Sequence, residues 1–197
     1  MPVSEEKSTR FRALTAGEIA LARRMFGDSI CYDKVGVTAQ SFMPFQPKGT
    51  AMAPDGNLYM YGCYHDDFSQ QPPMTQSHFI HEMTHVWQKQ NGVLDPIASA
   101  LKLSITYRFN YNAAYYYTLD AGRDLTSYNM EQQATIVQDY FLRAVCGHGR
   151  DTAQCKTAGG WDTTRPLYEA VLKNFLANPH YARKTTGGNK PPAPPSV

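Results

Sequence analysis

The stretch that decides the fold is residues 75–90, which read TQSHFIHEMTHVWQKQ. It contains neither glycine nor proline. Its apolar residues recur at the spacing of a helix that is buried along one face, and they are Phe79, Ile80, Met83, Val86 and Trp87. Pro72 and Pro73 precede the stretch and Gly92 follows it, so both ends carry residues that are typical of helix boundaries. The pattern predicts a mostly buried helix.

Residues 81–85 within this stretch form an HExxH motif. On a helix, His81 and His85 lie one turn apart and share a face, where two imidazoles can hold one zinc ion. Glu82 lies beside them, at a position from which it can take a proton from a water that zinc activates. The motif predicts a catalytic zinc site with Glu82 as the general base. The alternative is two core histidines on an ordinary amphipathic helix.

A zinc site of this kind needs a third protein ligand, and Glu131 is the candidate. Residues 128–145 carry apolar residues at helical spacing, which places Glu131 in the first turn of a second helix, three residues before the small Ala134. This resembles the ExxA element of gluzincin metallopeptidases, in which the glutamate is the third ligand and the small residue lets two helices approach closely. The alternative is a surface glutamate that the helix dipole favours near an N-terminus.

The other histidines are weaker candidates for the third ligand. His78 shares the helix of the motif, and three ligands from one straight helix do not converge easily on one ion, so we expect it at the rim. His148 is the second choice. His65 and His180 have no surroundings that suggest ligation. Residues 88–90 are Gln-Lys-Gln, so the motif does not extend to the third histidine of the pattern HExxHxxGxxH, which argues against a metzincin.

Bulk properties predict one ordinary globular domain. The chain has 197 residues, of which 42% are hydrophobic and 18% charged, and its formal net charge of +2 gives no reason to expect nucleic-acid binding. Neither a transmembrane helix nor a signal peptide is expected, because no apolar run reaches about 18 residues and the N-terminus has no apolar core. The cysteines leave two interpretations open: bridges Cys146–Cys155 and Cys31–Cys63, or free buried thiols.

The remaining patterns predict an α+β fold that is mostly helical, with a small sheet beside the HExxH helix. Thr15 and Glu18 form a capping box that opens a helix to about Phe26, and Asp55–Gly56 is a hairpin turn. Further expected elements are a strand over 35–40, the strands of the hairpin within 51–61, helices over 95–105 and 164–179, and an ambiguous aromatic stretch over 107–119. We expect a flexible N-terminus over 1–10, one zincin-like domain over 11–182, and a proline-rich disordered tail or linker over 183–197.

Two further features concern a substrate cleft. Residues 58–61 read LYMY, and we expect them to form an edge strand that pairs with the extended backbone of a substrate. An ordinary sheet strand is the alternative. Tyr115 and Tyr117 alternate along a strand-like stretch, so either could donate a hydrogen bond to the developing oxyanion. Packing aromatics are the alternative there.

Four stretches together resemble one set of bacterial gluzincin-like domains. They are LTAGEIALARRMFGDSI at 14–30, FIHEMTHVWQ at 79–88, YYYTLD at 115–120 and NMEQQATIVQDYF at 129–141. Such domains occur at the C-terminus of VgrG-type spike proteins and Rhs-type proteins, or as free-standing proteins, in association with type VI secretion. The resemblance covers roughly residues 12–145.

The resemblance implies a zinc metallopeptidase effector that a secretion machine delivers, without its own signal peptide, to a target-cell periplasm or a host cell. His81, His85 and Glu131 would hold the zinc, and Glu82 would be the base. It also implies a protein or peptide substrate, a secretion spike as carrier and a neutralising immunity protein. Two alternatives stay open: a non-catalytic, zinc-stabilised binding or cargo module, and a zinc amidase that acts on cell-wall amides.

Overall fold

The computed structural model describes residues 11–95, 99 and 111–184. The helices are α1 (Ala16–Phe26), α2 (Pro73–Gln90), α4 (Met130–Tyr140), α5 (Trp161–Val171) and α6 (Lys173–Ala177), and the strands are β1 (Arg12–Ala13), β2 (Gly36–Thr38), β3 (Thr50–Met52) and β4 (Leu58–Tyr61). Short helical turns are η2 (Tyr32–Lys34), η3 (Phe68–Gln70), η4 (Tyr111–Tyr115), η5 (Leu125–Ser127) and the π-helical η6 (Phe141–Val145). The expected α+β fold, mostly helical with a small sheet, is confirmed.

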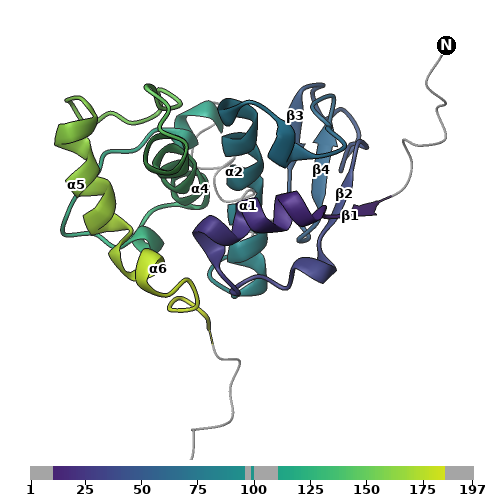
Figure 1. Ribbon diagram of the computed structural model, residues 1–197, viewed down its shortest axis with the longest axis horizontal. Coiled ribbons are helices and arrows are strands. Elements are labelled where there is room, and N and C mark those ends of the chain that lie inside the picture. The colour runs from purple at the N-terminus through teal and green to yellow at the C-terminus, as the bar shows by residue number, and fades with distance from the viewer. Residues whose placement is uncertain (1–10, 96–98, 100–110, 185–197) are drawn as a thin grey trace, which may run out of the picture.

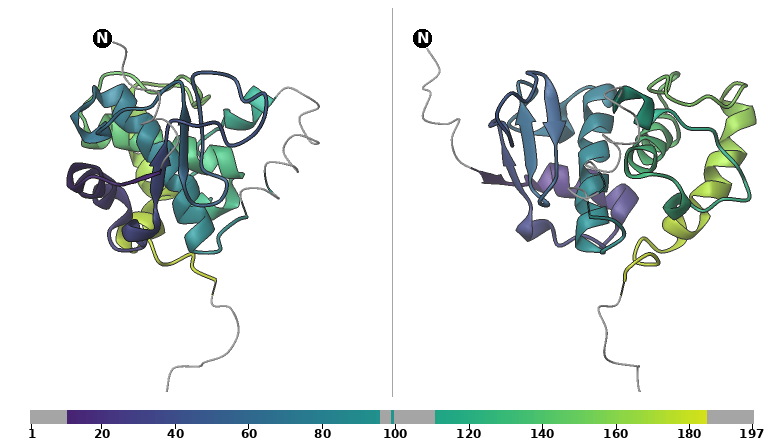
Figure 2. Two further views of the ribbon diagram at one scale, coloured as in Figure 1. Left: turned by 90° about the vertical axis from the view of Figure 1, so that its right-hand side faces the viewer. Right: turned by 180° about the vertical axis from the view of Figure 1, so that it is seen from behind.

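Helix α2 stands at the centre of the molecule (Figure 1). Pro73 opens it at the first helical position, where a missing N–H costs nothing. From Phe79 to Gln88 every residue is buried, because the sheet lies on one side of the helix and α4 on the other, as the reverse view in Figure 2 also shows. The buried apolar side chains of α2 therefore join both halves of one core.

The sheet has the strand order β1-β2-β4-β3. β4 pairs in parallel with β2 and antiparallel with β3, where Ala51 lies opposite Met60. The expected hairpin is confirmed, but the expectation that residues 58–61 form the edge strand is wrong. β4 alternates buried and half-buried side chains and lies inside the sheet, so that β3 takes the edge.

Helix α1 begins where the capping box predicts it, at Thr15, and it ends at Gly27, whose φ of 50° is a conformation that glycine adopts without strain. The Glu18 carboxylate of this box is completely buried. It accepts two hydrogen bonds from the Arg12 guanidinium, at 2.8 and 2.7 Å, and one from the backbone N–H of Phe68 at 3.0 Å. One side chain thus ties β1 and η3 to the start of α1.

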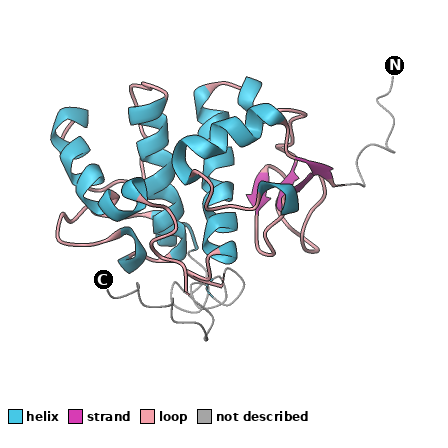
Figure 3. Ribbon diagram, turned by 60° about the horizontal axis from the view of Figure 1, so that its bottom comes forward, coloured by secondary structure: helices cyan, strands magenta, loops and turns pink. Residues whose placement is uncertain are grey.

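The C-terminal helix differs from its expected form over 164–179. It begins at Trp161 and is divided at Leu172 into α5 and α6, which lie on the side of α4 away from the sheet (Figure 3). The break brings Phe175 against Phe26 and Trp87, with ring centroids 5.8 and 5.1 Å away. The periodicity of residues 164–179 does not show this break. The contacts of Phe175 there are with rings distant in sequence, which local periodicity does not encode.

The remaining predictions concern one strand, two helices, the chain ends, the cysteines and a membrane span. The strand over 35–40 and the helix over 128–145 are present, the latter as α4 followed by η6. Apart from residues 95 and 99, the expected helix over 95–105 lies outside the described residues, as do residues 1–10 and the tail from 185. The four cysteines are free thiols, so neither bridge forms. In the part of the chain that the structure describes, no helix is long and apolar enough to cross a membrane.

We predict that Glu18→Ala destabilises the fold by about 3 kcal/mol, because it leaves the Phe68 N–H and the Arg12 guanidinium without their shared buried acceptor. In a chain of this length, the midpoint of thermal unfolding should fall by about 6–12 °C, measured by circular dichroism. The control is Glu169→Ala, which removes only the exposed ion pair with Arg165 and should cost less than about 1 kcal/mol. Equal midpoints for the two variants would contradict this role of Glu18.

Candidate metal centre

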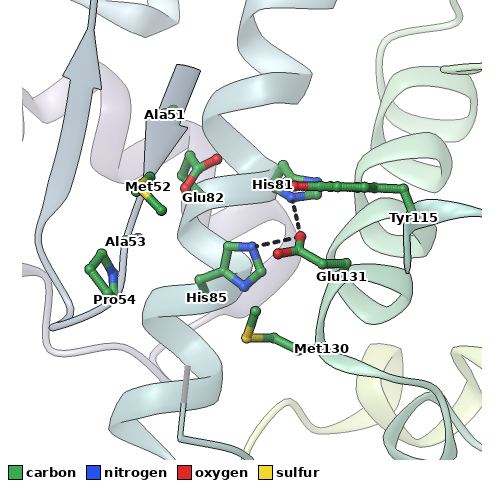
Figure 4. Close-up of a pocket in the computed structure, with 10 residues that line it drawn as sticks. All are labelled: Ala51, Met52, Ala53, Pro54, His81, Glu82, His85, Tyr115, Met130 and Glu131. Atoms are coloured by element: carbon green, nitrogen blue, oxygen red, sulfur yellow. Dashed lines mark hydrogen bonds and ion pairs between the residues drawn. The ribbon is translucent and has the colours of Figure 1, made fainter. Parts of the chain in front are cut away.

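Helix α2 places the three motif residues in one buried site. His81 and His85 are 5% and 6% exposed, and their ring centroids lie 5.0 Å apart. Both rings therefore project from the same face of the helix, as the i, i+4 spacing requires. Glu82 is 3% exposed and projects beside them toward the sheet (Figure 4).

Glu131 faces both histidines from α4. The Asn129 side chain caps this helix by accepting the backbone N–H of Gln132, whose own side chain accepts the N–H of Asn129. The cap fixes the first turn, which carries Glu131. Its Oε2 lies 3.3 Å from Nε2 of His81 and 3.3 Å from Nε2 of His85 (Figure 4). Ligands about 2.0–2.1 Å from a tetrahedral zinc ion lie about 3.3 Å apart, so this spacing suits one ion.

A glutamine orients each imidazole. Nδ1 of His81 lies 2.9 Å from Oε1 of Gln138, and Nδ1 of His85 lies 2.9 Å from Oε1 of Gln88. The Gln88 amide nitrogen donates to the carbonyl oxygen of Met130 and to the side chain of Gln133, so its oxygen must be the group that faces the ring. Each histidine therefore donates through Nδ1 and presents Nε2 to the centre of the site.

The electrostatics of the site favour a cation. Burial alone would lower the pKa of His85, but the Glu131 carboxylate outweighs burial and raises that pKa to about 9. Burial also opposes the ionisation of Glu131, yet the two imidazoles hold its pKa well below the usual range of a glutamate. A divalent cation that binds at pH 7 must therefore displace the proton of His85.

The donor set fits zinc. Two neutral imidazole nitrogens and one carboxylate are ligands that zinc takes in catalytic sites, where a fourth position stays open. Among the described residues, the converging group of His, Cys, Asp and Glu side chains contains these three and no fourth member. Three such donors would leave a fourth coordination position open to a bound molecule.

Glu82 has an unusual environment for a carboxylate. Its Oε2 is buried and makes no hydrogen bond, while its Oε1 lies 3.8 Å from Nε2 of His78. His78 has a side chain that is 39% exposed and lies at the rim of the site, where the sequence placed it. Buried carboxylate oxygens are normally paired, so an unpaired one beside three converging side chains marks Glu82 as a candidate functional residue.

The site opens into a cleft between β3 and η4. Ala51, Met52, Ala53 and Pro54 line it from the side of the sheet. Tyr115 lines it from the other side, with its ring stacked on that of His81 at a centroid distance of 5.9 Å (Figure 4). The strand at the cleft is therefore β3, the edge strand of the sheet.

Two residues that the sequence offered as site candidates, Tyr117 and His148, do not belong to the site. Tyr117 does not face the cleft, because its buried hydroxyl donates to Oδ2 of Asp139 at 2.6 Å and contacts the hydroxyl of Tyr168. The stretch that carries Tyr115 is the 3-10 turn η4, so the expected alternation of a strand does not apply. His148 is half-buried and contacts the backbone of Arg150, and it is not among the side chains that converge with His81 and His85.

Sequence reasoning missed the two glutamines that orient the histidines. Gln88 follows His85 by three residues, a spacing that places both on one helix face and could have identified it. Gln138 comes from α4, 57 residues from its partner His81, and no local pattern marks that pair.

The chain is similar in sequence and in structure to a known type VI secretion protein. No family model matches the chain. Over 168 residues, which is 83% of the chain, it is 39% identical to the type VI secretion system spike protein VgrG2b of Pseudomonas aeruginosa, but it spans only 15% of that protein. The solved effector domain of P. aeruginosa VgrG2b superimposes with a TM-score of 0.64 at 39% identity, over 71% of the chain and 78% of that domain.

We predict that Gln138→Leu weakens zinc binding by about 10–100-fold, because the imidazole of His81 loses the acceptor that fixes its tautomer and orientation. Competition with a zinc-binding dye at pH 7 measures the affinity. Gln70→Leu, at an exposed residue that ends η3 and does not line the site, is the matched control and should keep the wild-type affinity. An unchanged affinity in Gln138→Leu would show that this glutamine does not support the ligand.

Proposed function

The chain belongs to the family of the VgrG2b effector domain, and from this premise we propose that it is a type VI secretion effector that hydrolyses peptide bonds with a zinc ion. One observation carries the chemistry: Nε2 of His81, Nε2 of His85 and the carboxylate of Glu131 converge at the spacing of zinc ligands, beside Glu82 and a cleft. Family membership supports the effector role.

In this proposal His81, His85 and Glu131 hold the zinc ion. When bound, zinc lowers the pKa of a water to about 7 and polarises the carbonyl of the scissile bond. The protein keeps both imidazoles in the required tautomer through Gln138 and Gln88. It also buries the Glu131 carboxylate, so that solvent screens its attraction for a cation less than at the surface.

Glu82 is the general base of the proposed reaction. It accepts the proton of the attacking water and passes that proton to the leaving amine nitrogen, so the base ends in its original state. Its Oε2 makes no hydrogen bond that would compete with this transfer. Its position supports this role, because Glu82 is buried and lines the cleft together with His81, His85 and residues of β3.

Tyr115 is the proposed donor to the oxyanion. Its ring lies over His81 at the wall of the cleft, from which a phenol can reach a carbonyl oxygen that is held at the metal. Tyr117, the other residue that the sequence offered, directs its hydroxyl to Asp139 and Tyr168 inside the core.

Strand β3 is the proposed partner of the substrate backbone. It pairs through β4 on one side, and its residues Ala51 and Met52 line the cleft. An extended peptide that adds to the free edge of such a strand gains backbone hydrogen bonds and is held along the cleft. This transfers to β3 the role that the sequence assigned to residues 58–61.

The open ligand set favours an enzyme over a non-catalytic zinc module. A closed structural site needs four protein ligands, whereas three converge among the described residues, and the second-choice ligand His148 lies elsewhere. No comparable observation favours a zinc amidase that acts on cell-wall amides, so peptide hydrolysis is the function that we propose.

Delivery and partners follow from the family. The related VgrG2b is a type VI secretion spike protein, so we propose that a secretion spike carries this domain and that no signal peptide is needed. A toxic peptidase would act in a target-cell periplasm or a host cell on a protein substrate. The producing cell would then need an immunity protein that blocks the cleft.

We predict that Glu82→Gln lowers kcat for peptide hydrolysis by about 10²–10⁴-fold while zinc content and folding stay unchanged, because the amide keeps the shape of the side chain but cannot accept the proton. The assay combines hydrolysis of a denatured protein, read by mass spectrometry, with metal analysis of the same preparation.

The control for this prediction is Glu169→Gln, an exposed carboxylate on α5 that should leave the rate unchanged. Hydrolysis at the wild-type rate by Glu82→Gln would refute the proposed mechanism. Loss of zinc from Glu82→Gln would instead mean that Glu82 helps to hold the metal.

A further inference from the structure

The tautomer of each ligand histidine depends on which end of a glutamine amide faces the ring. An amide oxygen accepts the proton of Nδ1 and leaves Nε2 free to bind a metal. An amide nitrogen would instead donate to Nδ1, and the proton of the neutral ring would then lie on Nε2, where it blocks a metal. Gln138 and Gln88 each carry both kinds of atom. The groups on the far side of each amide must therefore determine which end faces the histidine.

Ser77 determines the orientation of Gln138. This serine is fully buried near the start of α2, and its hydroxyl donates to the carbonyl oxygen of Met74 at 2.8 Å. Because a carbonyl oxygen only accepts hydrogen bonds, the single hydroxyl proton is used there. The hydroxyl oxygen can then only accept, and the amide nitrogen of Gln138 donates to it at 3.3 Å. The amide oxygen of Gln138 consequently faces Nδ1 of His81, at 2.9 Å.

A second relay of hydrogen bonds reaches His85 through α4. The amide nitrogen of Gln133 donates to the backbone oxygen of Tyr128 at 2.8 Å, so the amide oxygen of Gln133 faces the other way. That oxygen accepts the amide nitrogen of Gln88 at 3.0 Å, and the carbonyl oxygen of Met130 accepts the same nitrogen at 3.0 Å. Each relay therefore ends on a backbone carbonyl oxygen, which cannot reverse its role as acceptor.

The two relays differ in how many groups hold the amide. The nitrogen of Gln88 has two acceptors, and one of them is a backbone oxygen that no change of side chain removes. Among the described residues, the hydroxyl of Ser77 is the one acceptor of the Gln138 nitrogen. Without that hydroxyl, no described group would fix which end of the Gln138 amide faces the ring. The tautomer of His81 thus depends on one hydroxyl, whereas that of His85 depends on two acceptors.

We propose that Ser77 is a positioning residue for the metal ligand His81, and that it acts by fixing the orientation of the Gln138 amide. Gln133 has the same role toward His85 but shares it with the backbone of Met130. Both residues act through a glutamine and neither contacts the ligand ring. The assignment rests on the proposed function where it concerns zinc, but its hydrogen bonds are between protein groups alone.

The first test compares zinc affinities by competition with a zinc-binding dye at pH 7. Ser77→Ala should weaken zinc binding about tenfold, because some molecules then present the amide nitrogen of Gln138 to His81. Gln133→Met should weaken it by no more than about threefold, because Met130 still orients Gln88.

Thr84→Val is the matched control for Ser77→Ala. The hydroxyl of Thr84 is also buried and donates to a carbonyl oxygen of α2, that of Ile80, but among the described residues no amide donates to it. The variant therefore loses the same kind of hydrogen bond without releasing a glutamine, and its zinc affinity should stay within about twofold of the wild type.

A second readout separates positioning from a general loss of stability. In nitrogen-15 labelled protein, with and without zinc, the Nδ1 proton of each ligand histidine should give a nuclear magnetic resonance signal that exchanges slowly with water, since it is buried and hydrogen-bonded. Ser77→Ala should speed the exchange of the His81 signal and leave the His85 signal unchanged. Adding Gln138→Glu to this variant should restore the His81 signal, because a carboxylate presents an acceptor in either orientation.

Wild-type exchange of the His81 signal in Ser77→Ala would overturn the role of Ser77, and so would equal acceleration at both rings. Failure of Gln138→Glu to restore the signal would show that amide orientation is not the cause. A zinc affinity of Ser77→Ala equal to that of Thr84→Val would also contradict the proposal. If the wild-type chain binds no zinc, the proposed function fails, and the ring signals of the metal-free chain alone decide the role of Ser77.

Discussion

The rest of the structure depends on one buried carboxylate held between two imidazoles. Glu131 is 4% exposed and faces His81 and His85 across the contact of α2 with α4. Removing an ionised carboxylate from water costs several kcal/mol, which close partners on the facing helix must offset. The fully buried Ala134 lets the two helices lie near enough for this. The buried charge of Glu131 is therefore stable only while α2 and α4 pack closely together in the core.

Hydrogen-bonded glutamines maintain that arrangement along the helix contact. Gln88 joins His85 to the start of α4 through Met130 and Gln133, and Gln138 joins His81 back to Ser77 near the start of α2. Each bond crosses from one helix to the other or fixes a ring beside the contact. The same contacts that bind α2 to α4 thus set the tautomer of both histidines, so the geometry of the site and the stability of the helix pair cannot vary independently.

The parts that sequence predicted are those that local patterns determine. The capping box at Thr15 fixes the start of α1, the five-residue motif fixes one face of α2, and Glu131 follows from its place in the first turn of the next helix. Whether β3 or β4 lies at the edge of the sheet depends on how β2 pairs, which alternation within residues 58–61 does not encode. Packing partners distant in sequence decide that Tyr115 and not Tyr117 lines the cleft. They also accompany the break at Leu172 and bring Gln138 to His81.

The central claim is that these side chains form an open zinc centre at the floor of the cleft. A crystal structure of the zinc-loaded chain, with anomalous diffraction measured at the zinc absorption edge, tests it most directly. The account predicts one anomalous peak about 2.0–2.2 Å from Nε2 of His81, Nε2 of His85 and a carboxylate oxygen of Glu131, with the fourth position facing β3 and Tyr115. A peak that excludes Glu131, or one enclosed by four protein ligands, would contradict it.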